Sequence, residues 1–183
     1  MHAMHRSLFL VGLLLCMSLA GCTSNDVSGS NNNMTEDEKQ LPEWSVGQNW
    51  LYTFITPQFG EDSARLVVAE IDNGSEEYVV GISSEREAQR HAVINHNPFL
   101  GRMTIDALAV YENGEPQQVF SFPWNVGDAW AFTLFEQEWD AQTVSLQNGN
   151  AQVEAESSEG HELTYTFSGS KGFLERLVWR DAE

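Results

Sequence analysis

The sequence predicts a mainly all-β fold: an antiparallel curved sheet, half-barrel or sandwich, built of two repeat-related halves with at most one or two short helices. Two observations carry this prediction. Asn-Gly between β-rich runs is a strong hairpin signal, and it occurs three times, at Asn73-Gly74, Asn113-Gly114 and Asn148-Gly149. A ten-residue pattern also occurs twice, at Trp44–Thr53 and Trp124–Thr133.

The runs beside these Asn-Gly pairs predict the strands in chain order. They cover residues 63–72 and 75–83, 103–112 and 117–122, and 143–147 and 151–156. His161–Ser168 alternates apolar and polar residues, and Gly172–Arg180 predicts a closing strand. Residues 84–95 depart from this rhythm, because Ser84 and Glu87 have the spacing of a capping box. We expect a helix there, with a strand from Ala88 onward as the alternative.

The repeated pattern reads Trp-x-Val-Gly-x-x-Trp-x-aromatic-Thr. Its matched positions are Trp44, Gly47 and Trp50 in the first copy and Trp124, Gly127 and Trp130 in the second. We interpret each copy as a turn followed by a strand, since glycine tolerates the backbone conformations of tight turns. The second Trp and the aromatic residue two positions later then share one face of the strand. We expect these side chains in the core rather than in a ligand site.

The N-terminal residues predict an export signal. A short basic start, Met1–Arg6, precedes the apolar stretch Leu8–Leu19, which is too short to span a bilayer as a helix. The stretch ends in Leu19-Ala20-Gly21-Cys22, which resembles the lipobox of prokaryotic lipoproteins at all four positions. The resemblance implies cleavage before Cys22 and lipid attachment to its thiol.

The sequence predicts three regions, of which the first is implied by this resemblance. We expect a signal peptide at 1–21, a lipidated flexible tether at 22–40, and a single β-rich domain at 41–183 with halves of about 41–120 and 121–183. The tether prediction rests on residues rich in Ser, Asn and acids without apolar periodicity. Cys16 lies within the expected signal peptide, so disulfides are not expected in the mature protein.

The chain is strongly acidic. It carries 9 basic and 27 acidic residues, a net charge of −18, which becomes −19 once Arg6 is removed with the signal peptide. Such a charge repels nucleic acid and anionic headgroups, so we expect no nucleic-acid partner. It fits either a solvated surface that maintains solubility or adaptation to a saline habitat, and we favour the second.

No catalytic motif is recognisable in the sequence: it contains no nucleophile elbow, P-loop, dinucleotide fingerprint, zincin helix or calcium loop. We therefore assign no catalytic residue, metal or cofactor. His91 and His96 are five residues apart, which suits neither one helix face nor one strand face, and His161 is the only other histidine outside the signal.

The segment from Arg86 to Arg102 is the basic exception. It contains Arg86, Arg90, His91, His96 and Arg102. One interpretation is a ligand or partner contact, since arginine suits bidentate binding of carboxylate or phosphate. The alternative is pairing with Glu85, Glu87 and acids of the sheet. Asn33 and Asn73 begin glycosylation sequons, although Asn73 is also explained as a hairpin residue.

The repeated Trp-x-Val-Gly pattern is similar to that of small β-rich surface lipoproteins of archaea and bacteria, a group that implies no catalytic residues. A looser likeness is to half-barrel lipoproteins that carry lipid. We expect an exported lipoprotein, anchored through Cys22 to the outer face of the cell membrane or in the cell envelope. It would be a non-catalytic binding or envelope-structural module, with an envelope protein, lipid or small ligand as partner. The alternative is a hydrolase of envelope polymers with a site assembled from scattered residues.

Overall fold

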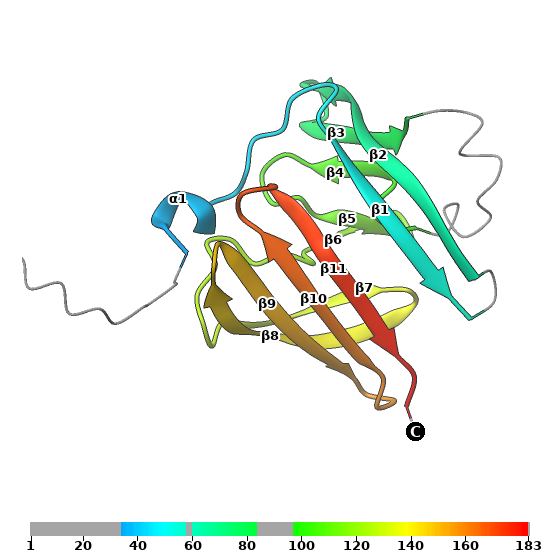
Figure 1. The fold of residues 1–183 in the computed structure, drawn as a ribbon, viewed down its shortest axis with the longest axis vertical. Coiled ribbons are helices and arrows are strands. Elements are labelled where there is room, and N and C mark those ends of the chain that lie inside the picture. Colours follow the sequence, from blue (N-terminus) through cyan, green and yellow to red (C-terminus); the bar gives the residue numbers. More distant parts are fainter. Residues whose placement is uncertain (1–33, 58–59, 84–96, 183) are drawn as a thin grey trace, which may run out of the picture. The chain divides into compact units, whose positions relative to one another are not determined.

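The computed structural model describes residues 34–57, 60–83 and 97–182, which form two antiparallel sheets and one short helix (Figure 1). The helix is α1 (Glu36–Lys39). Sheet A contains β1 (Asn49–Thr56), β2 (Gly60–Asp72), β3 (Glu77–Ile82), β4 (Gly101–Thr104), β5 (Val110–Glu112) and β6 (Glu115–Gln117). Sheet B contains β7 (Ala129–Leu134), β8 (Gln137–Gln147), β9 (Asn150–Ser157), β10 (Glu162–Ser168) and β11 (Phe173–Arg180). The predicted all-β antiparallel class is confirmed.

Within each sheet, every strand pairs with its neighbour in the chain. The order is β1-β2-β3-β4-β5-β6 in sheet A and β7-β8-β9-β10-β11 in sheet B. Both sheets are therefore simple meanders, and they occupy residues 49–117 and 129–180.

All three Asn-Gly pairs lie in hairpin turns, but the turns differ in length and backbone conformation. At Asn113-Gly114 and Asn148-Gly149 both residues have positive φ, the conformation of a two-residue type I′ turn. Asn73-Gly74 begins a four-residue connection between β2 and β3, where the positive φ belongs to Glu76. All three pairs thus predict a hairpin, whereas only two predict the turn type.

Two strand boundaries differ from the prediction. Residues 103–112 form two strands, β4 and β5, which pair through Met103 and Val110. The chain reverses between them at Leu108, which is fully buried with φ 51° and donates its N–H to the Thr104 carbonyl at 3.0 Å. No Gly, Pro or Asn marks this reversal. The strand expected at 117–122 ends at Gln117, while the expected helix at 84–95 lies outside the described residues.

The two repeat copies adopt the same local structure. In the first, Gly47 donates to the Val68 carbonyl at 2.8 Å and Gln48 donates to Ser45 at 3.0 Å. In the second, Gly127 donates to Thr143 at 2.8 Å and Asp128 donates to Asn125 at 3.2 Å. Gly47 and Gly127 have φ of 88° and 93°, so each turn requires a conformation that glycine adopts easily.

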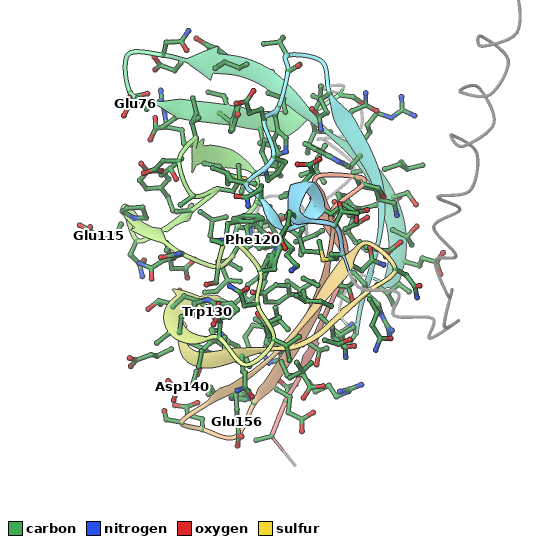
Figure 2. All side chains as sticks on the ribbon, turned by 90° about the vertical axis from the view of Figure 1, so that its left-hand side faces the viewer. Glu76, Glu115, Phe120, Trp130, Asp140 and Glu156 are labelled. Atoms are coloured by element: carbon green, nitrogen blue, oxygen red, sulfur yellow. The ribbon has the colours of Figure 1, made fainter. Side chains whose placement is uncertain are left out.

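Aromatic side chains fill the interior of the fold. Fully buried members include Trp124, Trp139, Tyr165, Phe120, Phe167 and Phe173. Phe120, labelled in Figure 2, lies 5.2 Å from Phe167 and 6.2 Å from Phe173 between ring centroids. Trp44 and Trp50 lie in the same cluster with centroids 4.9 Å apart. Trp44, Trp50 and Trp124 are thus buried core residues, whereas Trp130 is partly buried and packs against the core.

Side chains, not strand ladders, join the two sheets at their edges. At one edge Tyr52 of β1 donates to the Leu174 carbonyl at 2.6 Å, and the Trp50 indole donates to Lys171 at 2.9 Å. At the other, Gln117 and Glu112 of sheet A accept backbone N–H groups of Thr133 and Glu136, at 2.9 and 2.8 Å. Two of these bonds, those that involve the backbone of Leu174 and Thr133, satisfy groups that the edge strands β11 and β7 otherwise expose.

Candidate functional site

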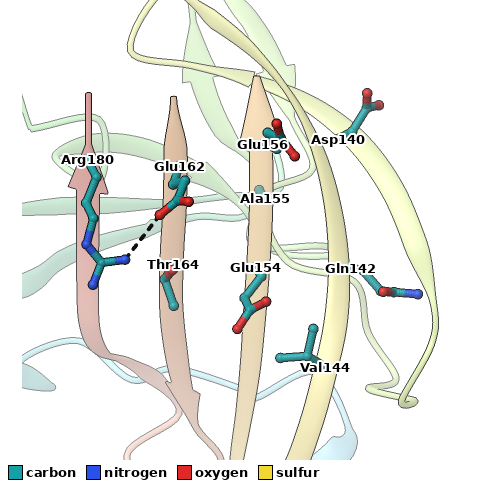
Figure 3. A pocket seen from close by; sticks show the side chains of 9 residues that line it. All are labelled: Asp140, Gln142, Val144, Glu154, Ala155, Glu156, Glu162, Thr164 and Arg180. Atoms are coloured by element: carbon teal, nitrogen blue, oxygen red, sulfur yellow. Dashed lines mark hydrogen bonds and ion pairs between the residues drawn. The ribbon is translucent and has the colours of Figure 1, made fainter. Parts of the chain in front are cut away.

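The outer face of sheet B contains an acidic depression of about 470 Å³ (Figure 3). Its lining residues are Asp140, Gln142, Val144, Glu154, Ala155, Glu156, Glu162, Thr164 and Arg180. Alternation along the strands produces this face: Trp139, Val153 and Leu163 point into the core, while their neighbours Asp140, Glu154 and Glu162 are exposed.

The strand register aligns four of the charged residues in a row. Asp140 lies opposite Glu156, Glu156 opposite Glu162, and Glu162 opposite Arg180. Arg180 pairs with Glu162 at 3.3 Å, in a bond between two side chains that are each 62% exposed. Three carboxylates therefore lie side by side with one cation at the end of the row. Like charges directly opposite each other destabilise a sheet.

The chemistry open to this face is electrostatic. Its carboxylates are exposed, so burial does not prepare one of them as a general acid. No histidine lines the depression. Among the described residues, no group of three or more His, Cys, Asp or Glu side chains is placed to hold a metal ion. The face repels anions and attracts cations, and nothing in its geometry selects one ligand.

Of the predicted basic contact, only Arg102 falls within the described residues; Arg86, Arg90, His91 and His96 lie outside them. Arg102 is bound into a network of sheet A. Its guanidinium donates to Ser75 at 3.2 Å and to Asp72 at 3.4 Å, and it pairs with Glu77. Arg102 therefore pairs with acidic residues of the sheet, which was the alternative to a ligand contact.

Glu77 is the centre of that network. Its side chain is 9% exposed, and it accepts hydrogen bonds from Tyr111 at 2.6 Å and Ser75 at 2.8 Å as well as from Arg102. These hydrogen bonds hold the pKa of Glu77 below its usual value. The bond from Tyr111 has the largest effect, followed by those from Arg102 and Ser75. Bonds from Ser75 and the Gly74 backbone lower the pKa of Asp72. The network stabilises ionised carboxylates and leaves Arg102 bound to its own sheet.

The other predicted positions lie apart from these clusters. Asn73 is exposed in the β2–β3 connection and lines a small hollow with Glu76, Ile105 and Asp106. Cys22 and Asn33 lie outside the described residues. His161 lies near the C-terminus, where its Nδ1 accepts the Ala182 N–H at 3.1 Å and its ring packs edge-on against Trp179.

The two pairs of repeat tryptophans differ in their hydrogen bonds. The indole of Trp44 donates to the Gly172 carbonyl at 2.9 Å, and that of Trp50 to Lys171. Within the described chain, the buried indole nitrogens of Trp124 and Trp130 have no hydrogen-bond acceptor. The copies share a backbone conformation but pack against different surroundings.

Sequence reasoning missed the acidic depression. The alternation of acids along 150–157 was visible, but the site also needs Asp140 and Glu162 opposite Glu156, and that depends on the register of three strands. No protein-family model, curated protein or solved structure matches this chain. In the described part of the chain, no helix has the length and apolar character needed to cross a membrane.

Proposed function

We propose that this protein is an exported lipoprotein, anchored through lipid on Cys22, whose folded part is a non-catalytic binding or envelope-structural module. The observation that carries the proposal is the complete lipobox Leu19-Ala20-Gly21-Cys22 behind a basic start and an apolar stretch of signal-peptide length. Stable anchoring needs more than one acyl chain, because each buried CH₂ contributes only about 0.8 kcal/mol.

The arrangement of the folded part supports a presenting role more than a carrying one. The space between the sheets is occupied by fully buried aromatic side chains such as Phe120, Trp124 and Phe167. Both hollows described above lie on the surface and are lined by charged residues. A partner would therefore meet exposed strand faces and turns, and a net charge of −18 for the whole chain would favour cationic or neutral partners.

A hydrolase is the weaker proposal. The depression on sheet B offers several carboxylates, but they are exposed, and Glu162 is paired with Arg180. Hydrolysis by acid and base needs one carboxyl group held in its neutral form, and burial is the usual means.

Replacement of Cys22 tests the anchor. We expect Cys22→Ser to abolish incorporation of labelled lipid and to leave the protein either unprocessed or released from membranes. Cys16→Ser is the matched control, because Cys16 lies in the apolar stretch and outside the lipobox; it should label and fractionate as the wild type does. Lipid labelling of Cys22→Ser at the wild-type level would contradict the proposal.

A further inference from the structure

We propose that residues 34–40 form a clamp that fastens the chain next to the lipid anchor onto one end of sheet B, so that this end of the domain faces the membrane. We call these residues the clamp segment. The inference rests on the proposed lipid anchor and adds the orientation of the domain. It corrects the view of residues 34–40 as part of a flexible tether, because the structure packs them against the sheets.

Two turns of sheet B hold the clamp segment. The backbone N–H of Gly169 donates to Gly149 at 2.7 Å, which joins the β10–β11 and β8–β9 turns. A Cβ on Gly169 would come within 2.7 Å of Glu38 Cβ, 2.9 Å of Glu38 O and 3.0 Å of Met34 Cε. The turn therefore accepts the segment because position 169 has no side chain.

Apolar and backbone contacts complete the clamp. The Met34 side chain, within a polar stretch of sequence, is only 4% exposed and belongs to the core cluster. The Lys39 carbonyl accepts the N–H of the buried Trp124 at 3.1 Å. A capping box between Thr35 and Glu38 shapes the segment locally, so less ordering is required on docking.

This attachment fixes where the chain leaves the folded part. Twelve peptide links separate Cys22 from Met34, and a fully extended chain of that length spans about 40 Å. Asp140, Glu156 and Glu162 lie toward the opposite end of sheet B; Asp140 is seven residues along β8 from Gln147, or about 24 Å. In Figure 1, α1 lies by the β8–β9 turn and the C-terminus lies at the other end. The acidic depression is therefore at the end of sheet B farther from the point where the chain leaves toward the anchor. Because the intervening stretch can reach farther than this separation, we propose a preferred orientation, with the depression on the side away from the membrane, and not a fixed one.

Trypsin cleavage after Lys39 measures whether the clamp is closed, because a protease needs the Lys39–Gln40 bond in an open segment. The full lipoprotein in membranes is digested, and cleavage after Lys39 is compared with cleavage after Arg176 in β11. Gly169→Ala should speed cleavage after Lys39 about tenfold or more, since Gly169 does not have a positive φ and the three atoms nearest to the new methyl group all belong to the clamp segment. Met34→Asp should do the same from the segment side.

Gly81→Ala is the matched control, because its Cβ would meet only Ala69 Cβ at an ordinary 3.9 Å. Cleavage after Arg176 should stay at the wild-type rate in Met34→Asp. Wild-type rates after Lys39 in both Met34→Asp and Gly169→Ala would overturn the clamp. So would equal acceleration at Lys39 and Arg176 in Met34→Asp, because the whole domain would then be opening.

Orientation is read with dyes on Ser170→Cys, at the clamp end, and Ser158→Cys, at the other end, in vesicles carrying a headgroup quencher. Both positions are exposed. We expect stronger quenching at position 170 and a smaller difference when Met34→Asp is added. Equal quenching would overturn the orientation. Absence of the wild-type protein from membranes would refute the lipid anchor, while the cleavage rates would still decide on the clamp.

Discussion

Glu77 illustrates how single residues of sheet A depend on ionisation. Its carboxylate accepts hydrogen bonds from Tyr111 and Ser75 and pairs with Arg102. Tyr111 can serve only as a donor here, and the bond to Glu77 correspondingly raises the pKa of its hydroxyl. The folded state therefore favours the charged form of Glu77 relative to the unfolded chain.

This preference predicts a pH-dependent contribution to stability. A carboxyl group whose pKa is lowered by folding stabilises the protein above its unfolded pKa, and the stabilisation is lost as pH falls through its folded pKa. We expect Glu77→Gln to lower the free energy of unfolding at pH 7. The gap between the wild type and the variant should narrow as pH falls from about 7 to about 3. Urea denaturation at several pH values measures this gap.

The neighbouring Glu76 provides the control. It is exposed, and its part in the fold is the backbone carbonyl that accepts the Ile105 N–H at 2.9 Å. Glu76→Gln should leave stability close to the wild-type value across the same range. A gap for Glu77→Gln that stays constant with pH would mean that its charge is not what stabilises the network.

At the level of elements, the two Trp-x-Val-Gly turns adopt the same backbone conformation at two separate places in the fold. Gly47 and Gly127 have positive φ, and a Cβ on either would meet no atom within 4 Å. Replacing either glycine with alanine therefore measures the free-energy cost of the left-handed backbone conformation alone, without a contribution from steric clash.

We expect Gly47→Ala and Gly127→Ala each to lower the free energy of unfolding by about 1–2 kcal/mol, the usual cost of a left-handed conformation for a residue with a Cβ. Chemical denaturation of both variants tests this. Gly81→Ala, in a strand without positive φ, should be neutral or slightly stabilising. If either substitution left the free energy of unfolding unchanged, that turn would be able to change its conformation without loss of stability.

The turns were the most predictable part of the molecule. Asn-Gly and Trp-x-Val-Gly have local conformational causes, so sequence located them correctly. The reversal at Leu108 could not be found this way, because a leucine with positive φ is held there by burial in the core and not by its own preference. The clamp segment was missed for a similar reason, since Met34 and Val27 are the only apolar side chains in the polar run of residues 23–40.

At the scale of the whole molecule, the acidic charge is concentrated by strand register as well as by composition. Glu156 lies between Asp140 and Glu162, directly opposite both. Composition alone predicted an acidic surface, but which carboxylates become neighbours depends on long-range pairing that local patterns do not fix.

Neutralising the middle of this row should stabilise the protein. We expect Glu156→Gln to raise the free energy of unfolding by roughly 0.2–1 kcal/mol at low ionic strength, because like charges opposite each other in a sheet cost about that much. The gain should shrink as salt is added, since screening weakens the repulsion between exposed charges. Thermal denaturation over a range of salt concentrations measures both effects.

Glu138→Gln is the comparison, because Glu138 is exposed on the adjacent strand β8 but lies opposite Thr133 and not opposite a carboxylate. It should show a smaller gain and a weaker change with salt. An equal gain in stability and an equal salt dependence for the two variants would mean that the effect comes from the total charge and not from the row of opposed carboxylates.

The meander order has a consequence for how an exported chain acquires its fold. Strands that pair only with sequence neighbours form contacts in the order in which they emerge, without waiting for distant partners. A chain threaded N-terminus first through a translocation channel can therefore complete sheet A before sheet B has appeared. Two sets of contacts require the last hairpin. They are the hydrogen bonds from Trp50 and Tyr52 to the carbonyls of residues 171 and 174, and the packing of Glu38 against Gly169. If the chain is exported as we propose, contact between the two sheets would form last during secretion. The same hairpin that joins the sheets would also hold the end of the domain that follows the proposed lipid anchor.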